Sequence, residues 1–498
     1  MIKRGSGILM HITSLPSRFG IGDFGPEAYR FADFLAETKQ SCWQILPLTP
    51  TDPMHGNSPY SSASSSAISP WMLSPELMVE GGYLKESDLN SMPDFDQDKV
   101  DFGAVAEYKK ALLDKAYKHF KENSHRTDFT FFCRDHAYWL DDFALFMILK
   151  RDFGGKAWNQ WPVEYRDRHQ DTMEKAKADH EENIQREKFI QYLCYKQWFA
   201  LREYCNDRGI QLFGDIPIYV NYDSVDVWSN PQIFKLNDDK TPTFVAGVPP
   251  DYFSETGQLW GNPVYNWDVL GDSGYEWWIR RLRHNFRQFD IIRIDHFRGL
   301  VAYWEVPNGE ETAINGKWVT VPVDDFFNAM LKHFFLPPIV AEDLGMITAE
   351  VRETLKKYTL PGMKILMFGF GADDPNHPYL PHNYEKNYVA YTATHDNNTV
   401  RGWFEGETNP EIRKRLFMYI GREVSSQELP WEMIRLVMAS RAALTIFPMQ
   451  DILCLGGETR MNRPAHGNGN WNWRMRGDSI SPDVKDKLAE FTYIYNRV

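Results

Sequence analysis

The sequence has few cysteines, and they form no pattern that suggests a cross-link or a metal site. Five cysteines occur in 498 residues, they are widely spaced, and none belongs to a CxxC pair. An odd and scattered set argues against a disulfide framework and against a zinc site. The N-terminal residues also lack the apolar segment of a signal peptide. We therefore expect a cytoplasmic protein in a reducing environment.

Long hydrophobic runs and an excess of positive charge are absent as well. No run of about 18 apolar residues occurs, so we expect no membrane-spanning helix. Lysine and arginine number 55 against 68 aspartates and glutamates, which gives a formal net charge of −13. Nucleic acids and anionic membranes attract proteins with a basic face. Neither is therefore an expected partner, and a neutral substrate fits better.

Three motifs of cofactor chemistry are incomplete or missing. Gly369 and Gly371 lack the remainder of a GxGxxG fingerprint, and no phosphate-binding P-loop is present. His180 and Glu181 do not begin an HExxH zinc motif, because position 184 is isoleucine. The sequence thus disfavours nucleotide and zinc chemistry, and we expect neither a cofactor nor a metal.

Aromatic residues, by contrast, are abundant. They make up 15% of the chain and include 17 tryptophans, while hydrophobic residues reach 43%. Most of these side chains must fill a large core, but a surplus would suit a cleft in which flat rings cover the apolar faces of sugars. The length corresponds either to two to four domains or to one barrel with large insertions.

Eight short apolar segments, with helical stretches between them, favour the barrel. Helical periodicity over Glu27–Thr38, between the first two segments, is typical of a strand–helix–strand unit. We therefore predict an α/β fold, a (β/α)8 TIM barrel with large, mainly helical insertions, spanning residues 1–498 as one catalytic domain. The predicted strands lie within Gly7–His11, Trp43–Leu48, Gln211–Ile218, Ile291–Ile294, Pro337–Asp343, Met363–Phe368, Tyr388–Thr399 and Ala443–Asp451.

A bare barrel needs about 250 residues, so roughly half of the chain must be insertion. We assign residues 64–205, after the second strand, to a helical insertion, because its periodicity is helical and its charges fit a solvated face. Residues 219–285, after the third strand, form a second, irregular insertion. Within it, the Gly- and Pro-bracketed stretch Gly247–Pro263 carries Asp251, Gln258 and Trp260, and we predict a mobile active-site loop there.

Three predicted strands end in carboxylates. Asp295, Glu342 and Asp396 follow the fourth, fifth and seventh strands, and Asp215 interrupts the third. The C-terminal ends of barrel strands meet at one face, where such enzymes keep their chemistry. Convergent carboxylates repel one another, so some must shift their pKa or pair with cations. Either a divalent metal or the cleavage of a glycosidic bond would use such a site, and the scarcity of imidazoles favours the second.

Glycoside chemistry gives the acids distinct roles. A retaining enzyme needs an ionised nucleophile and a protonated acid flanking the scissile bond. Asp295 suits the nucleophile, because Arg293 lies two residues away on the same strand face. Glu342 suits the acid/base, because partial burial would hold its proton. For Asp215, and for Asp343 directly after Glu342, a purely structural role is as compatible with the sequence as a functional one.

The loop after the second predicted strand is rich in turn-forming residues and carries Tyr60. At a strand's C-terminal end, an aromatic ring on such a loop could stack on a ligand. It could equally anchor the loop, and the sequence leaves both roles open.

Several motifs, taken together and in order, resemble the amylomaltase or disproportionating-enzyme family of 4-α-glucanotransferases, glycoside hydrolase family 77 within the α-amylase clan. The resemblance covers nearly the whole chain outside the helical insertion. One departure follows Pro464, where this family more often has glycine and this chain has Ala465. The motifs are Gly56–Ser61, Gly214–Val220, Val245–Ser254, Gly257–Pro263, Arg293–Arg298, Ala341–Gly345, Thr394–Thr399 and Arg460–Pro464.

The resemblance implies transfer of an α-1,4-glucan segment to the 4-hydroxyl of another glucan or of glucose, through a covalent intermediate. It implies Asp295 as nucleophile, Glu342 as acid/base and Asp396 as stabiliser of the transition state. The substrate-binding residues that it implies are Tyr60, Asp215, Asp251, Gln258, Trp260, Arg293, His395 and Asn462.

Two other functions compete with glucan transfer. A plain α-1,4-glucan hydrolase would use the same residues for its covalent step. A catalytically silent glucan-binding barrel would have lost a carboxylate, and all three are present. The expected partners are α-1,4-glucans and maltooligosaccharides, with the chain as a monomer or a homodimer.

Overall fold

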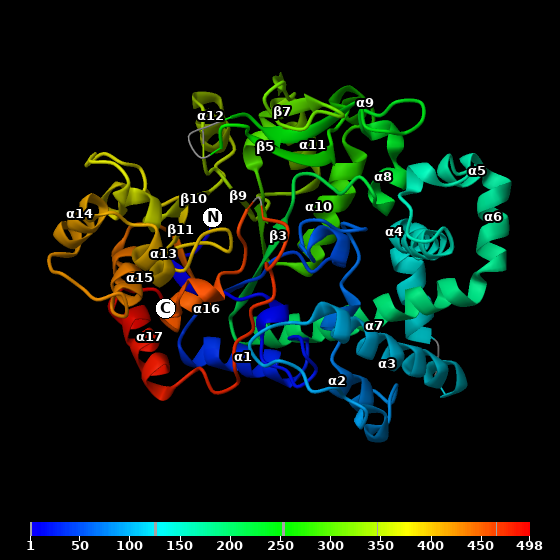
Figure 1. The fold of residues 1–498 in the computed structure, drawn as a ribbon, viewed down its shortest axis with the longest axis horizontal. Helices are drawn as coiled ribbons and strands as arrows, with labels where there is room; N and C mark the ends of the chain where they lie inside the picture. Colours follow the sequence, from blue (N-terminus) through cyan, green and yellow to red (C-terminus); the bar gives the residue numbers. More distant parts are fainter. Residues whose placement is uncertain (1, 124–126, 251–253, 346, 465) are drawn as a thin grey trace.

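The structure is a computed structural model that describes residues 2–123, 127–250, 254–345, 347–464 and 466–498 (Figure 1). An eight-stranded, all-parallel sheet with the order β10-β11-β12-β1-β2-β3-β6-β9 forms its centre. All eight predicted strands are present, which confirms the predicted (β/α)8 barrel. Their bounds are β1 Gly5–Leu9, β2 Cys42–Gln44, β3 Gln211–Ile216, β6 Ile291–Ile294, β9 Ile339–Ala341, β10 Gly362–Ile365, β11 Tyr388–Tyr391 and β12 Leu444–Pro448.

Two contacts close the barrel between the end strands β9 and β10. The Ala341 N–H donates to the Pro361 carbonyl at 2.8 Å. The Met363 N–H donates to the buried Asp343 carboxylate at 2.6 Å. The Asp343 side chain thus replaces a backbone acceptor at the seam, which gives this acid a structural role.

Helices connect the barrel strands as predicted, with one exception. Residues 366–387, all of which the structure describes, hold only the 3-10 helices Leu366–Phe370 and Pro381–Asn383 between β10 and β11. At the end of the chain, α17 packs against α1 and α15. The α-helices outside the 64–205 segment are α1 Pro26–Glu37, α8 Val225–Ser229, α9 Trp267–Asp272, α10 Glu276–Gln288, α11 Val323–His333, α12 Ala349–Lys357, α13 Val400–Gly406, α14 Pro410–Ile420, α15 Leu429–Ala439, α16 Met449–Ile452 and α17 Pro482–Ile494.

The described residues of the 64–205 segment are mainly helical, and α4, α5 and α6 extend to one side of the barrel, at the right of Figure 1. Two helices, α6 and α7, follow one another in the second half of this segment and are separated at His180. The His180 ring contacts Asp152 at 3.1 Å. Buried Lys109 on α3 donates to the carbonyls of Trp71 and Leu73 and so fastens this segment. Its helices are α2 Pro75–Glu80, α3 Phe102–Asn123, α4 Thr127–Asp152, α5 Val163–Arg166, α6 Gln170–Asp179 and α7 Glu181–Asp207.

A second, antiparallel sheet with the order β5-β4-β7-β8 stands beside the barrel, near the top of Figure 1. It comprises β4 Phe244–Val248, β5 Gln258–Pro263, β7 Ala302–Pro307 and β8 Lys317–Thr320. This sheet was not predicted from the sequence: Gly247–Pro263, predicted as a mobile loop, contains the end of β4 and all of β5. The pattern was missed because β4 pairs with β7, which follows only after barrel strand β6.

No described helix combines the length and the apolar composition needed to cross a membrane.

Candidate active site

Strand register places the acids of β3, β6 and β9 side by side. Asp215 on β3 pairs directly with Arg293 on β6. The ladder between β6 and β9 ends at Ile294 and Ala341, so Asp295 and Glu342 are the next residues of two neighbouring strands. Adjacent strands lie about 4.8 Å apart. The two carboxylates therefore rise from neighbouring tips on the C-terminal side of the barrel.

Arg293 holds two of these carboxylates. Its guanidinium contacts Asp215 Oδ2 and Asp295 Oδ1, each at 2.7 Å. The Arg293 and Asp215 side chains are buried, whereas the Asp295 side chain is 29% exposed and so remains open to a ligand. Burial works against the charge of Arg293, but the two carboxylates outweigh it and raise its pKa. A permanent positive charge thus faces Asp295.

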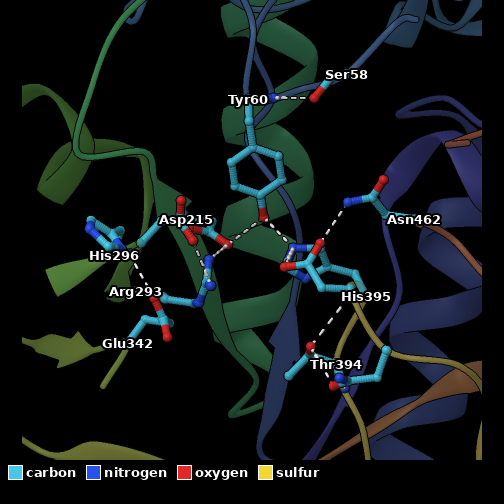
Figure 2. Close-up of polar contacts among 12 residues, drawn as sticks. Ser58, Tyr60, Asp215, Arg293, His296, Glu342, Thr394, His395 and Asn462 are labelled. Atoms are coloured by element: carbon cyan, nitrogen blue, oxygen red, sulfur yellow. Dashed lines mark hydrogen bonds and ion pairs between the residues drawn. The ribbon is translucent and has the colours of Figure 1, made fainter. Parts of the chain in front are cut away.

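Glu342 lies in a different environment. Its two carboxylate oxygens accept the N–H groups of His296 and Leu344, each at 2.8 Å. Burial raises the pKa of the Glu342 carboxyl to about 7; Asp295 acts in the same direction, and Arg293 opposes it. Figure 2 shows Glu342 beside Arg293 and below His296. Glu342 therefore favours its protonated form and lies beside Asp295, which is ion-paired with Arg293, an arrangement that suits general acid catalysis.

Tyr60 links this group to the far side of the barrel mouth. Its hydroxyl lies 2.8 Å from Asp215 Oδ2 and 2.9 Å from His395 Nε2, between the two groups in Figure 2. An ionised Asp215 can only accept, so the single Tyr60 proton goes to Asp215 and the Tyr60 oxygen must accept from His395. This arrangement assigns a proton to Nε2 of His395. The ring of Tyr60 also stacks on the imidazole, with centroids 5.3 Å apart.

Asp396 lies in the loop after β11, and residues from this loop and from the chain after β12 hold its side chain. Asn462 donates to its Oδ1 at 2.7 Å, and His395 Nε2 lies 3.2 Å from its Oδ2. Arg460 fixes the turn by donating to the Asp396 backbone carbonyl at 2.7 Å. Burial alone would raise the pKa of Asp396, but His395 and the Asn462 amide hold it well below its usual range. Asp396 is therefore an anion that stays ionised on the side opposite Glu342.

Two of the remaining predicted residues, Gln258 and Trp260, lie on β5. Trp260 is 37% exposed, and its ring meets that of His296 edge-on at 4.7 Å. Gln258 accepts from the Trp260 indole N–H at 3.2 Å. Because His296 directly follows Asp295, the exposed Trp260 ring lies close to the proposed nucleophile and could cover one face of a sugar. Asp251 lies outside the described residues.

Two rings near His395 were not predicted from the sequence. Trp471 contacts both Tyr60 and His395, with centroids 5.8 and 6.1 Å away. His11, at the end of the first barrel strand, shares a small cavity with His395. Burial lowers the pKa of His11 to about 3, and His395 adds to this effect, so His11 remains neutral. His11 follows the first barrel strand, so its position could have indicated a residue of the site. No feature of the sequence indicates that Trp471 contacts Tyr60 and His395.

Two loops meet over this site at Gly56. Gly56 has a φ of +63°, and a Cβ there would lie 2.5 Å from the Gly467 carbonyl oxygen, so only glycine fits. Asn470 braces the second loop by accepting the Arg463 N–H at 2.9 Å and donating to the His466 carbonyl at 2.8 Å. The described residues on either side of the departure from the family pattern, Arg463 and His466, are thus both held by the Asn470 side chain.

Comparison with known proteins assigns the chain to a family. The sequence profile of the family described as 4-alpha-glucanotransferase matches residues 10–480. The 4-alpha-glucanotransferase of Aquifex aeolicus is 47% identical over 99% of both chains, and that of Thermus thermophilus is 43% identical over 98% of both. The structure of an amylomaltase from Streptococcus agalactiae in complex with acarbose matches with a TM-score of 0.96 and 42% identity, covering 99% of this chain and 100% of that one. The chain belongs to the 4-α-glucanotransferase family.

Proposed function

We propose that this protein transfers a segment of an α-1,4-glucan to the 4-hydroxyl of another glucan or of glucose, with retention at the anomeric carbon. The observation that carries the proposal is the pairing of two neighbouring acids in opposite environments. Asp295 faces the Arg293 guanidinium at 2.7 Å, whereas burial raises the pKa of Glu342 to about 7. A retaining mechanism needs both an ionised nucleophile and a proton donor about 5–5.5 Å apart.

In the first step, a carboxylate oxygen of Asp295 attacks the anomeric carbon while the bond to the leaving glucan oxygen breaks. Glu342 gives its proton to that oxygen, and a covalent glycosyl ester forms on Asp295. In the second step, the acceptor 4-hydroxyl attacks the same carbon, Glu342 takes the hydroxyl proton, and Asp295 leaves as a carboxylate. Asp396, held by His395 and Asn462, stabilises the positive charge that develops on the sugar ring in the transition state of each step.

The family assignment favours transfer over hydrolysis, because the relatives carry the name of a transferase. Transfer must also outcompete water for the glycosyl ester. We propose that β5, which carries Gln258 and Trp260, covers the acceptor side and excludes solvent. Tyr60, Asp215, Asp251, Gln258, Trp260, Arg293, His395 and Asn462 are the proposed substrate-binding residues.

Maltotriose separates the two activities. We expect incubation with maltotriose to give glucose and a ladder of longer maltooligosaccharides, while the concentration of reducing ends stays constant. Each transfer breaks one glycosidic bond and makes another, whereas hydrolysis adds a reducing end at every turnover. Chain-length chromatography with a reducing-end assay measures both quantities. A steady rise in reducing ends without longer products would refute the proposed transfer.

The Tyr60 hydroxyl offers a second test. We expect Tyr60→Phe to lower kcat/KM for maltotriose by about 10- to 100-fold, because a hydrogen bond to a charged group contributes about 1.5–3 kcal/mol. The ring contacts with His395 and Trp471 should survive, so the thermal unfolding midpoint should change little. Steady-state kinetics and a thermal melt measure the two effects. Full activity in Tyr60→Phe would show that the link between Asp215 and His395 does not support catalysis.

We also propose the setting in which this activity operates. Cytoplasmic action on α-1,4-glucans and maltooligosaccharides is supported by five free thiols and by the net charge of −13. We propose one catalytic domain over residues 1–498, with 64–205 and 219–285 as its insertions, acting as a monomer or a homodimer.

A further inference from the structure

A second cavity lies away from the barrel mouth, where the helical insertion meets α10. Its volume is about 350 Å³, and its lining comes from α4, α7 and α10. None of the residues proposed for catalysis lines it. The helix α10 leads directly into β6, the strand that carries Arg293. The cavity is thus separate from the active site but borders an element that supports it.

The deep wall of this cavity is a preorganised polar network. Buried His284 contacts Tyr138 through Nδ1 at 2.8 Å and the Ser66 carbonyl through Nε2 at 2.9 Å. Tyr195 and Gln288 contact the same Nε2, each at 2.9 Å. Burial lowers the pKa of His284 to about 3, so this wall is neutral. Neutral hydroxyl, amide and imidazole groups in fixed positions suit the hydroxyls of a sugar.

Positive charge gathers at the cavity mouth. Arg287 and Arg202 both line the cavity. Arg202 is neutralised by Asp290 at 2.6 Å, whereas no carboxylate of the described residues lies within ion-pair distance of Arg287. Burial and then Arg287 lower the pKa of His136, another lining residue, to about 4. In a chain with a net charge of −13, an unpaired arginine beside a cavity favours an anionic ligand.

Two phenyl rings complete the lining. Phe199 stacks on Tyr195, with ring centroids 5.7 Å apart, and Phe286 packs against Phe334 at 5.0 Å. Both phenyl rings line the cavity and are only partly buried, so each contributes apolar surface that a sugar ring could contact.

We propose that this cavity binds a small phosphate ester of a sugar. The phosphate would contact the Arg287 guanidinium, and the sugar would lie between the phenyl rings and the polar wall. Arginine binds phosphate through charge-assisted and often bidentate hydrogen bonds, which supply both affinity and orientation. The occupant would thus be a charged derivative of a sugar, distinct from the neutral glucan at the barrel mouth.

Isothermal titration calorimetry on the full-length protein tests this proposal, with glucose 6-phosphate as the probe and glucose, maltose and inorganic phosphate for comparison. We expect saturable binding of glucose 6-phosphate, weaker binding of inorganic phosphate, and no Arg287-dependent binding of glucose or maltose. Arg287→Gln should weaken glucose 6-phosphate binding about tenfold or more, a loss of about 1.4 kcal/mol. Arg287→Gln should also keep the wild-type melting temperature and maltotriose activity.

Arg283→Gln, compared with Arg287→Gln, is the matched control. Arg283 lies on the same helix, but its guanidinium faces the ring of Phe334 at 5.8 Å and does not line the cavity. We expect Arg283→Gln to bind glucose 6-phosphate within about twofold of the wild type, because the Arg283 side chain is not part of the cavity lining. Equal weakening by both variants would indicate a diffuse surface field and overturn the proposal. Absence of saturable binding, or Arg287-independent binding, would overturn it as well.

Discussion

Asp295→Asn is expected to abolish the maltotriose ladder, with kcat falling by about 10⁴-fold or more, the scale seen when an enzyme loses its nucleophile. The amide cannot form the glycosyl ester, and it no longer neutralises the Arg293 guanidinium that lies 2.7 Å away. Because the Asp295 side chain is 29% exposed, its replacement should leave the barrel core intact. Product chromatography measures the loss, and circular dichroism with a thermal melt checks the fold.

A neighbouring acid provides the control for Asp295→Asn. Asp343 lies beside Glu342 but accepts the Met363 N–H at 2.6 Å and holds the barrel seam. Asp343→Asn removes the same charge and retains an oxygen acceptor, so we expect activity within about tenfold of the wild type, with any loss appearing in the melting temperature. Unchanged turnover in Asp295→Asn, or an equal loss in both variants, would contradict Asp295 as the nucleophile.

Glu342→Gln is expected to lower kcat for maltotriose by about 10³-fold, within the range that a positioned acid/base contributes. A donor such as α-glucosyl fluoride loses its leaving group without a proton, so its first step should largely survive in this variant. A burst of released fluoride, followed by a slow steady state, would identify the second step as the one that needs the base. Equal loss with both donors would contradict an acid/base role for Glu342.

The pH dependence of the wild type should follow the same group. Glu342 must be protonated for the first step, and burial raises its pKa to about 7. We therefore expect kcat/KM for maltotriose to fall as the pH rises above about 7, and the residual activity of Glu342→Gln to lack this alkaline decline. Kinetics across the pH range, with the melting temperature recorded at each pH, separate titration from unfolding.

The sign of the stability effect follows from linkage. The folded state keeps the Glu342 proton after the unfolded chain, with its usual pKa of 4.5, has released it. Stability therefore falls as the pH rises from about 4.5 to about 7. Glu342→Gln should remove this decline, so the variant should melt higher than the wild type above pH 7 and much the same below pH 4.5.

The sequence alone was enough to predict the barrel strands and the strands after which the acids lie. Buried parallel strands are apolar runs, so Ile291–Ile294 stands out, and the charged residues that follow it mark the strand's functional end. The motifs around Asp295, Glu342 and Asp396 indicated the family before any contact was known. These features are local, since each can be read within a short window of residues.

The small antiparallel sheet and the Trp471 ring over His395 required the tertiary structure. β4 pairs with β7, and Trp471 contacts Tyr60, although each pair is separated by long stretches of chain. Hydrophobic periodicity predicts local structure but not which distant segments come into contact. Those contacts depend on how the loops close and how the elements pack in the folded chain.

The register of β3, β6 and β9 likewise decides the chemistry of the acids. It sets Arg293 against both Asp215 and Asp295 and leaves Glu342 with backbone donors in a buried position. The sequence by itself determined which acids would meet at one end of the barrel. Only the tertiary structure decided which of them keeps its proton, because protonation depends on burial and on neighbours brought together by folding.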